Sequence, residues 1–115
     1  MVFRNLTQHT LNVRLPDGER VILPTGVVAR VAVDCAVTRE VDGIPVVVRS
    51  TGAVVDLPAP QDGVVFLVST LVLEALAKAG STRSDVLAPA TAPTDNPLRN
   101  AAGHIVAVTR LAGLV

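Results

Sequence analysis

Apolar and polar residues alternate along residues 10–15 (TLNVRL), so that the three apolar side chains share one face. A period of two is typical of a half-buried strand. The next residues favour a turn, because Pro16 presets its own φ and Gly18 tolerates a positive φ. The sequence therefore predicts an antiparallel hairpin in which residues 19–23 (ERVIL) return beside residues 10–15.

A second alternating run covers residues 27–33 (VVARVAV), with Arg30 on the outward face. Further along, Asp42 and Gly43 separate two runs of β-forming residues, and Asp-Gly is the strongest short-range hairpin signal. Together with the first hairpin, these runs predict an antiparallel meander. The inward residues of the first run are Val27, Ala29, Val31 and Val33.

The pattern changes from strand to helix in the middle of the chain. Residues 64–68 (VVFLV) are a continuous apolar run, which suits a central strand covered on both faces. Ser69 or Thr70 is the natural N-cap of the helix that follows, and Gly80 stands where a left-handed C-cap is expected. We therefore expect a helix over about residues 69–79. Its apolar stripe consists of Leu71, Val72, Ala75, Leu76 and Ala79.

Residues 81–103 are rich in Pro, Thr, Ala and Asn and are too long for an ordinary connection, so we expect a functional or mobile loop. Residues 104–111 (HIVAVTRL) are expected to form the final strand. A chain of 115 residues suits a single domain over 1–115. The predicted class is α+β, with an antiparallel, partly barrel-like β-sheet, one main helix at about 69–79 and a long ordered loop.

Composition narrows the choice of partners. Half of the residues are hydrophobic and 17% are charged, which is typical of a well-packed domain. The 10 basic and 10 acidic residues cancel, and Phe3 and Phe66 are the only aromatic residues, so a nucleic acid polymer is not an expected partner. The mean hydropathy of +0.52 is high for a small chain. We expect the apolar excess to be shielded in a homo-oligomer.

The sequence also bears on the cellular compartment. The single Cys35 cannot form an intramolecular disulfide and is expected to be a small hydrophobe in or beside a strand. The N-terminus turns polar at Arg4, unlike the apolar core of a signal peptide. No apolar run approaches the roughly 20 residues of a membrane-spanning helix. We therefore expect a cytoplasmic location and no membrane partner.

Asn5, Thr7 and His9 form the first candidate site. If residues 3–9 are extended, alternate side chains share a face, and these three would present an amide, a hydroxyl and an imidazole to the edge of a ribose or a base. The alternative is that Asn5 and Thr7 satisfy local backbone groups in a turn, with His9 an exposed edge residue.

Ser69 and Thr70 form the second candidate site, at the junction of strand and helix. The unpaired amides and the positive dipole end of a helix N-terminus attract a phosphate or carboxylate, and a hydroxyl can assist. A glycine-rich loop is missing, which excludes a standard nucleoside-triphosphate site. Simple N-capping is the competing interpretation.

The long loop is the third candidate. Its prolines can stiffen it enough to hold donors in place, and an arginine there can grip a phosphate with two hydrogen bonds. Solvated loops also carry such groups without function, and Arg83 and Asp85 can equally form a surface pair of little consequence. The polar residues of this loop that we consider as candidates are Arg83, Asp85, Thr91, Thr94, Asp95, Arg99 and Asn100.

Catalytic and metal-binding motifs are sparse. Ser69 lies in no Gly-x-Ser-x-Gly motif, and His9 and His104 show none of the usual spacings of metal ligands. Acid–base pairs can still be assembled from distant positions. We expect no metal and no other cofactor, and we assign no catalytic residue.

Six segments in this order carry a resemblance: NLTQHTLNV, PTGVVARV, DGIPVV, LPAPQDGVVFLVSTLV, RSDVLAPATAPT and GHIVAVTRL. Together they resemble a family of short proteins from actinobacteria and their phages, in which an Asn-Leu-Thr-x-His start recurs. The resemblance spans almost the whole chain but brings no assigned activity and no catalytic residues. It implies a phage or prophage accessory role, in the host cytoplasm. Small phage proteins of this type include sponges that sequester nucleotide immune signals of the host.

From these observations we expect non-catalytic binding and sequestration of a small nucleotide-derived ligand, such as a cyclic nucleotide or an ADP-ribose derivative. Its candidate contacts are Asn5, Thr7, His9, Ser69, Thr70, Arg83, Asp85, Thr91 and Arg99. Two alternatives stay open. One is a small hydrolase or lyase that acts on such a nucleotide, and the other is a homomeric structural or interaction protein.

Overall fold

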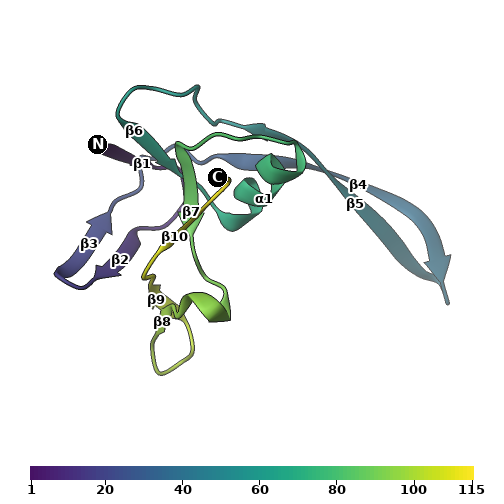
Figure 1. The fold of residues 1–115 in the computed structure, drawn as a ribbon. Helices are drawn as coiled ribbons and strands as arrows, with labels where there is room; N and C mark the ends of the chain where they lie inside the picture. The colour runs from purple at the N-terminus through teal and green to yellow at the C-terminus, as the bar shows by residue number, and fades with distance from the viewer.

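The computed structural model describes residues 1–115, except for the side chain of Thr51. Within these residues it contains ten strands, one α-helix and one short 3-10 helix. Figure 1 shows a small body from which one long hairpin, formed by strands β4 and β5, projects. Short strands and turns build the body around a four-stranded sheet.

The central sheet has the strand order β1-β6-β7-β10. Strand β6 (Val64–Leu67) is parallel to both β1 (Val2–Asn5) and β7 (Val86–Pro89), and β10 (Leu111–Gly113) runs antiparallel to β7. Because β1 and β6 are parallel and in register from Val2 with Val64, their carboxyl ends lie at the same edge of the sheet. The sheet is therefore mixed.

The apolar run around β6 is the centre of the core, as the sequence predicts. Phe66 and Val68 pack in one cluster with the helix, while Val65 and Leu67, which alternate with them, are buried on the opposite face. A strand covered on both faces has no need of polar positions, which explains the continuous apolar run. The buried hydrophobic cluster on the helix side of the sheet comprises Leu6, Ala29, Phe66, Val68, Val72, Leu73, Val86 and Ala88.

The predicted helix is confirmed as α1 (Thr70–Lys78). Ser69 is its N-cap, and its Oγ accepts a hydrogen bond from the amide of Val72 at 3.3 Å. At the other end Gly80 has φ +78°, and the amide of Ser81 donates to the carbonyl of Leu76 at 3.0 Å. This is a Schellman ending, which satisfies carbonyls of the last turn.

The apolar stripe of α1 differs from the prediction at three positions, because Leu71 and Ala79 are exposed and Leu73 is buried. Leu73 is buried at 8% exposure, whereas Leu71 is 53% exposed. The buried face is centred on Val72 and Leu73, and the root of the β4–β5 hairpin and β7 lie against the helix. Leu71 therefore faces away from the core and towards the cleft described below.

Both predicted hairpins are confirmed. Strand β2 (Leu11–Leu15) pairs with β3 (Gly18–Ile22), and β4 (Arg30–Val41) pairs with β5 (Ile44–Val55). At the tip of the second hairpin Asp42 and Gly43 have φ values of +51° and +78°. Two successive positive φ angles are what a tight two-residue hairpin turn requires, which is why Asp-Gly identifies it so reliably.

The predicted meander is wrong, because the two hairpins form separate two-stranded sheets. After β3 the chain does not turn back to pair with β4. It runs past the end of β1 instead, where Pro24 bridges to Asn5 and the amide of Ala29 donates to the carbonyl of Leu6 at 3.0 Å. The α+β class holds, and the sheets are not closed into a barrel.

The segment predicted as one long loop contains regular structure. Its first part forms β7, an inner strand of the central sheet, and a 3-10 helix η1 (Pro93–Asp95) and strand β8 (Leu98–Arg99) follow. The predicted final strand is split into β9 (Ile105–Ala107), which pairs with β8, and β10. Between β9 and β10, Val108 pairs with Val13 of β2 instead, and this bridge divides the predicted strand in two.

The side chain of Asn5 ties several of these segments together. It is fully buried, and its Nδ2 donates to the carbonyls of His9 at 2.9 Å and Ile22 at 3.0 Å. Its Oδ1 accepts from the amide of Thr7 at 3.0 Å and from the Thr7 hydroxyl at 2.7 Å. The backbone carbonyl of Asn5 accepts from the amide of Thr25 at 3.0 Å. Strand β1, the following turn and the end of β3 are thus joined at one residue.

We expect Asn5→Ala to lower the free energy of unfolding by at least about 2 kcal/mol, since a buried polar group left without a partner costs about 1–3 kcal/mol. The matched control is Asn12→Ala, which removes one exposed hydrogen bond to the carbonyl of Val106 at 3.2 Å. It should cost under about 1 kcal/mol. Urea denaturation followed by circular dichroism measures both, and equal losses would contradict the role given to Asn5.

Candidate functional site

A cleft of about 300 Å³ lies at the carboxyl ends of β1 and β6. Its three sides are the turn after β1, the N-terminus of α1 and the root of β4. Leu6, Leu71 and Val72 contribute apolar wall. The polar side chains around it are Thr7, Gln8, His9, Arg30 and Ser69.

Backbone hydrogen bonds of Leu6 hold these three sides together. Its amide donates to the carbonyl of Leu67 at 2.8 Å, at the end of β6. Its carbonyl accepts from Ala29, which directly precedes β4. Main-chain contacts therefore fix the turn after β1, the end of β6 two residues before the helix cap, and the root of the hairpin relative to one another.

The predicted common face of Asn5, Thr7 and His9 is wrong, because β1 ends at Asn5 and the chain bends over residues 7–9. Asn5 points into the core and is fully used by its structural hydrogen bonds. Thr7 is half-buried and its hydroxyl contacts Asn5. The side chain of His9 is exposed and lines the cleft. The alternative of local backbone satisfaction therefore describes Asn5 and Thr7 better.

The helix N-terminus is the second side of the cleft. Of Ser69 and Thr70, Ser69 lines the cleft while its Oγ caps the amide of Val72. The first turn of α1 carries no acidic side chain among the described residues, so no carboxylate of that turn offsets the positive end of the helix dipole. The two predicted clusters, the turn near His9 and the start of the helix, thus meet in one cleft.

Arg30 brings a positive charge to the third side. Its guanidinium lies 3.5 Å from the carboxylate of Asp56, and the two side chains are 71% and 54% exposed. An ion pair of this length and exposure contributes little, because water screens it. The guanidinium is therefore free to turn towards an anionic group in the cleft.

Arg83 and Asp85 lie at the opposite edge of the sheet. Because β6 and β7 are parallel, the residues before β7 and those after β6 lie at opposite ends of the strands. Arg83 makes two hydrogen bonds to Asp85, at 3.0 Å and 2.7 Å, and its guanidinium lies 5.9 Å from the ring centre of Phe66. Arg83 therefore does not share a site with the amides after Ser69.

The remaining candidates of the long loop also lie away from the cleft. Thr91 borders a different hollow, beside Asn12 and Val106. Arg99 donates to the carbonyl of Gly103 at 2.8 Å and so closes the loop between β8 and β9. Neither side chain joins His9 or Ser69.

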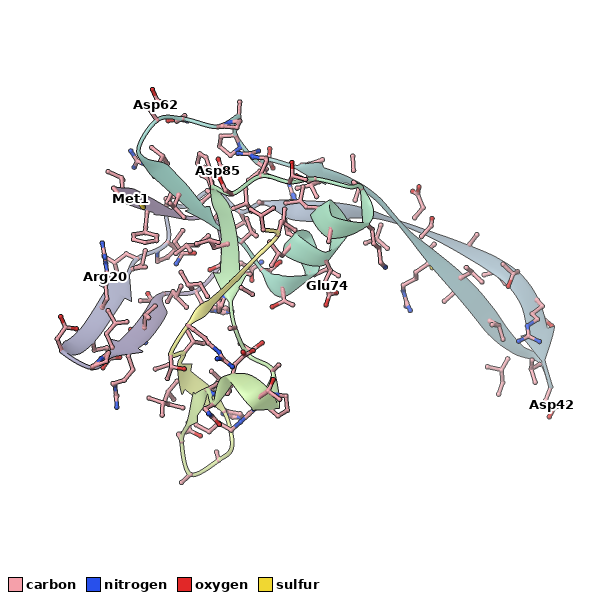
Figure 2. The ribbon with its side chains drawn as sticks, in the orientation of Figure 1. Met1, Arg20, Asp42, Asp62, Glu74 and Asp85 are labelled. Carbon is pink, nitrogen blue, oxygen red and sulfur yellow. The ribbon has the colours of Figure 1, made fainter. Side chains whose placement is uncertain are left out.

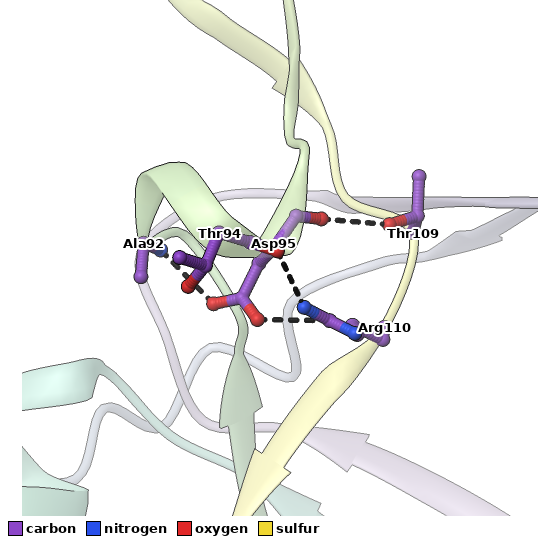
Figure 3. Close-up of polar contacts among 5 residues, drawn as sticks. All are labelled: Ala92, Thr94, Asp95, Thr109 and Arg110. Atoms are coloured by element: carbon purple, nitrogen blue, oxygen red, sulfur yellow. Dashed lines mark hydrogen bonds and ion pairs between the residues drawn. The ribbon is translucent and has the colours of Figure 1, made fainter.

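Asp95 anchors the loop to the C-terminal segment, as Figure 3 shows. Its carboxylate accepts from the amide of Ala92 at 3.1 Å and from Nε of Arg110 at 2.8 Å. Arg110 also donates to the carbonyl of Thr94, and the hydroxyl of Thr109 donates to the carbonyl of Asp95 at 3.0 Å. These contacts order the loop, and they use Thr94 and Asp95 structurally.

Sequence reasoning missed Gln8, Arg30 and Leu71 as cleft residues. Gln8 stands within the polar cluster near the N-terminus, so its neighbourhood was a usable signal. The sequence gives no such signal for Arg30 or Leu71. Arg30 reaches the cleft through the contact of Ala29 with Leu6, and Leu71 reaches it through the rotation of α1 about its axis.

Cofactor and membrane features are limited. In the part of the chain that the structure describes, no group of three or more His, Cys, Asp or Glu side chains is placed to hold a metal ion. Within the same residues, α1 is too short to span a bilayer.

Comparison of the chain with protein-family models, curated proteins and solved structures finds no match. The function must therefore be argued from the cleft itself.

The pair of Arg83 and Asp85 generates a pH prediction. Hydrogen bonds from Arg83 lower the pKa of Asp85 below its ordinary value of 3.8. A carboxyl whose pKa is lower in the folded chain stabilises the fold above the pKa of the unfolded chain and loses this contribution as the pH falls through the folded value. We expect Asp85→Asn to be less stable than the parent at neutral pH, and the difference to vanish in acid. Urea denaturation across this range measures it, and a difference that is constant with pH would contradict the assignment.

Proposed function

We propose that the chain binds and sequesters a small nucleotide-derived ligand in the cleft between the turn at residues 7–9, the start of α1 and the root of β4. The observation that carries the proposal is the meeting of Arg30 with the helix N-terminus around an apolar wall. Such a combination suits a ligand with an anionic group at one end and a planar, weakly polar ring at the other.

Each side of the cleft has a part in recognition. A phosphate fits between the guanidinium of Arg30 and the amides at the start of α1, where hydrogen bonds to an anion are strong. Leu71, which is 53% exposed, offers apolar contact to a base. Gln8 and His9 supply donors and acceptors for a ribose or base edge.

The size of the cleft and its side chains favour binding over turnover. Its volume of about 300 Å³ is at the lower end of small-molecule sites, which suits one nucleotide unit of a larger signal. Hydrolysis needs an acid and a base on either side of the reacting bond. Among the described lining residues there is no carboxylate, and His9 is the one imidazole. The resemblance to short actinobacterial and phage proteins supports a sponge for a host immune signal, and a small hydrolase or lyase is the alternative.

Ligand capture tests the proposal directly. The purified chain is incubated with cyclic dinucleotides, cyclic trinucleotides and ADP-ribose derivatives, separated from free ligand, denatured, and the released molecules are identified by mass spectrometry. Intact release of a captured nucleotide supports sequestration. An altered product supports the hydrolase or lyase, and no capture from any of these probes overturns nucleotide binding.

We expect Arg30→Ala to weaken binding of the captured nucleotide at least tenfold, because a hydrogen bond to a charged group contributes about 1.5–3 kcal/mol. The matched control is Arg14→Ala. Arg14 is also exposed and also lies 3.5 Å from one carboxylate, that of Glu19, but it belongs to β2, outside the cleft.

His9→Ala should also weaken binding while changing the free energy of unfolding by less than about 0.5 kcal/mol, since the side chain is exposed. Isothermal titration calorimetry measures the affinities. Unchanged affinity in both Arg30→Ala and His9→Ala, or an equal loss in Arg14→Ala, would remove the ligand from this cleft.

A further inference from the structure

The β4–β5 hairpin extends well beyond the body of the protein. The radius of gyration is 16.7 Å, against about 13 Å for a compact domain of this length. Figure 2 places Asp42, at the tip, far from the side chains labelled on the body, such as Glu74 on α1. We call residues 33–50 of this hairpin the arm.

One face of the arm continues the core-facing side of its root. At the root, Val31 and Val54 are paired and pack against the core cluster. Alternation along β4 carries this face outward through Val33, Cys35 and Val37. Val37 is paired with Val47, so the face has an apolar centre formed by both strands.

This face is uncovered in the single chain. Val33, Val37 and Val47 are 50%, 64% and 37% exposed. An isolated two-stranded hairpin is marginally stable in water, and contiguous exposed apolar side chains mark an interaction surface. A surface of this kind needs a partner whose shape and charges match it.

We propose that the partner is the same face of the arm in a second copy of this chain, related by a two-fold axis through the Val37–Val47 pair. A symmetric contact requires a surface that is complementary to itself. The charges on this face meet that condition. Arg49, paired with Cys35, lies one step from the centre towards the body. Glu40, paired with Pro45, lies one step towards the tip, because the register shift between Val37 and Arg39 inserts an extra residue in β4 and returns Glu40 to the face of Val47.

The two-fold axis places Arg49 of each copy opposite Glu40 of the partner subunit. Within one chain the two residues are two steps apart along the arm, about 13 Å, which is too far for an ion pair. Both are exposed, and neither belongs to an ion pair among the described side chains. The contact therefore satisfies two pairs of charges and buries the valines between them.

The size of the face sets the expected strength. It is two strands, about 10 Å, wide and roughly 25 Å long, so it buries several hundred Å² on each copy. The two copies together therefore bury less than the about 1,200 Å² of a specific, stable interface, which places the contact among weak, transient ones. We expect a reversible dimer with micromolar affinity, which fits the high mean hydropathy of +0.52.

A charge exchange tests the interface. Sedimentation equilibrium over a range of concentrations should show a monomer–dimer equilibrium for the parent. Glu40→Arg and Arg49→Glu should each weaken the dimer at least tenfold, because each places like charges opposite one another twice. The double variant with both changes should restore the affinity to within about threefold of the parent.

Asp34→Arg is the matched control, because Asp34 is exposed and paired with Ser50 on the opposite face of the arm. It should leave the dimer unchanged. A monomer at every concentration, a dimer indifferent to both single variants, or a loss seen in Asp34→Arg but not in Glu40→Arg would overturn the proposal. A monomer at every concentration would indicate that a different protein covers this face.

Cys35 offers a second readout without further engineering, since it is the one cysteine of the chain and lies exposed on this face. Its rate of reaction with a thiol reagent should fall as the protein concentration rises through the dimer range. Val37→Asp should abolish both the dimer and this protection while leaving the circular dichroism spectrum unchanged. A rate independent of concentration in a sample that sediments as a dimer would place the interface elsewhere.

Discussion

The hydrogen bonds of one buried amide side chain, that of Asn5, are the constraint on which the other contacts of the body depend. They end β1 by turning the chain towards His9, and they hold the carbonyl of Ile22 at the end of β3. A buried amide is tolerated in an apolar core only when its donors and acceptors are satisfied. Here two backbone segments and Thr7 provide those partners. The polar cluster after β1 thus connects β1, the following turn and the end of β3, and the cleft lies beside it.

The direction of the strands explains why the cleft lies where it does. In a parallel pair both strands end at the same edge, so the turn after β1 and the N-terminus of α1 necessarily meet. The same rule moves Arg83 and Asp85 to the far edge, where their contact with Phe66 stabilises the sheet. The strand directions therefore separate the polar residues into two groups, one at the cleft and one, Arg83 and Asp85, at the opposite edge of the sheet.

Features determined by neighbouring residues could be predicted from the sequence. The turn at Asp42 and Gly43 and the caps of α1 at Ser69 and Gly80 depend on local backbone angles and were predicted correctly. Strands β1 and β7 were missed because each has four residues and forms through long-range parallel pairing with β6. Arg30 was missed for the same reason, since its place in the cleft depends on pairing between Ala29 and Leu6. The candidate site was predictable only as separate polar clusters.

The arm and the cleft share one element, because the root of β4 supplies Arg30 and Val31 to the cleft while its outer part carries the exposed valines. The proposed second copy would cover the apolar face of this two-stranded arm, and an isolated hairpin of two strands is only marginally stable in water. Because β4 is one continuous strand, the proposed dimer contact and the proposed ligand contact at Arg30 both lie on it. If both proposals hold, any coupling between ligand binding and association acts through β4, and it is reciprocal because it is a free energy shared by both equilibria. Strand β4 thus joins the exposed apolar side chains of the arm to the cleft.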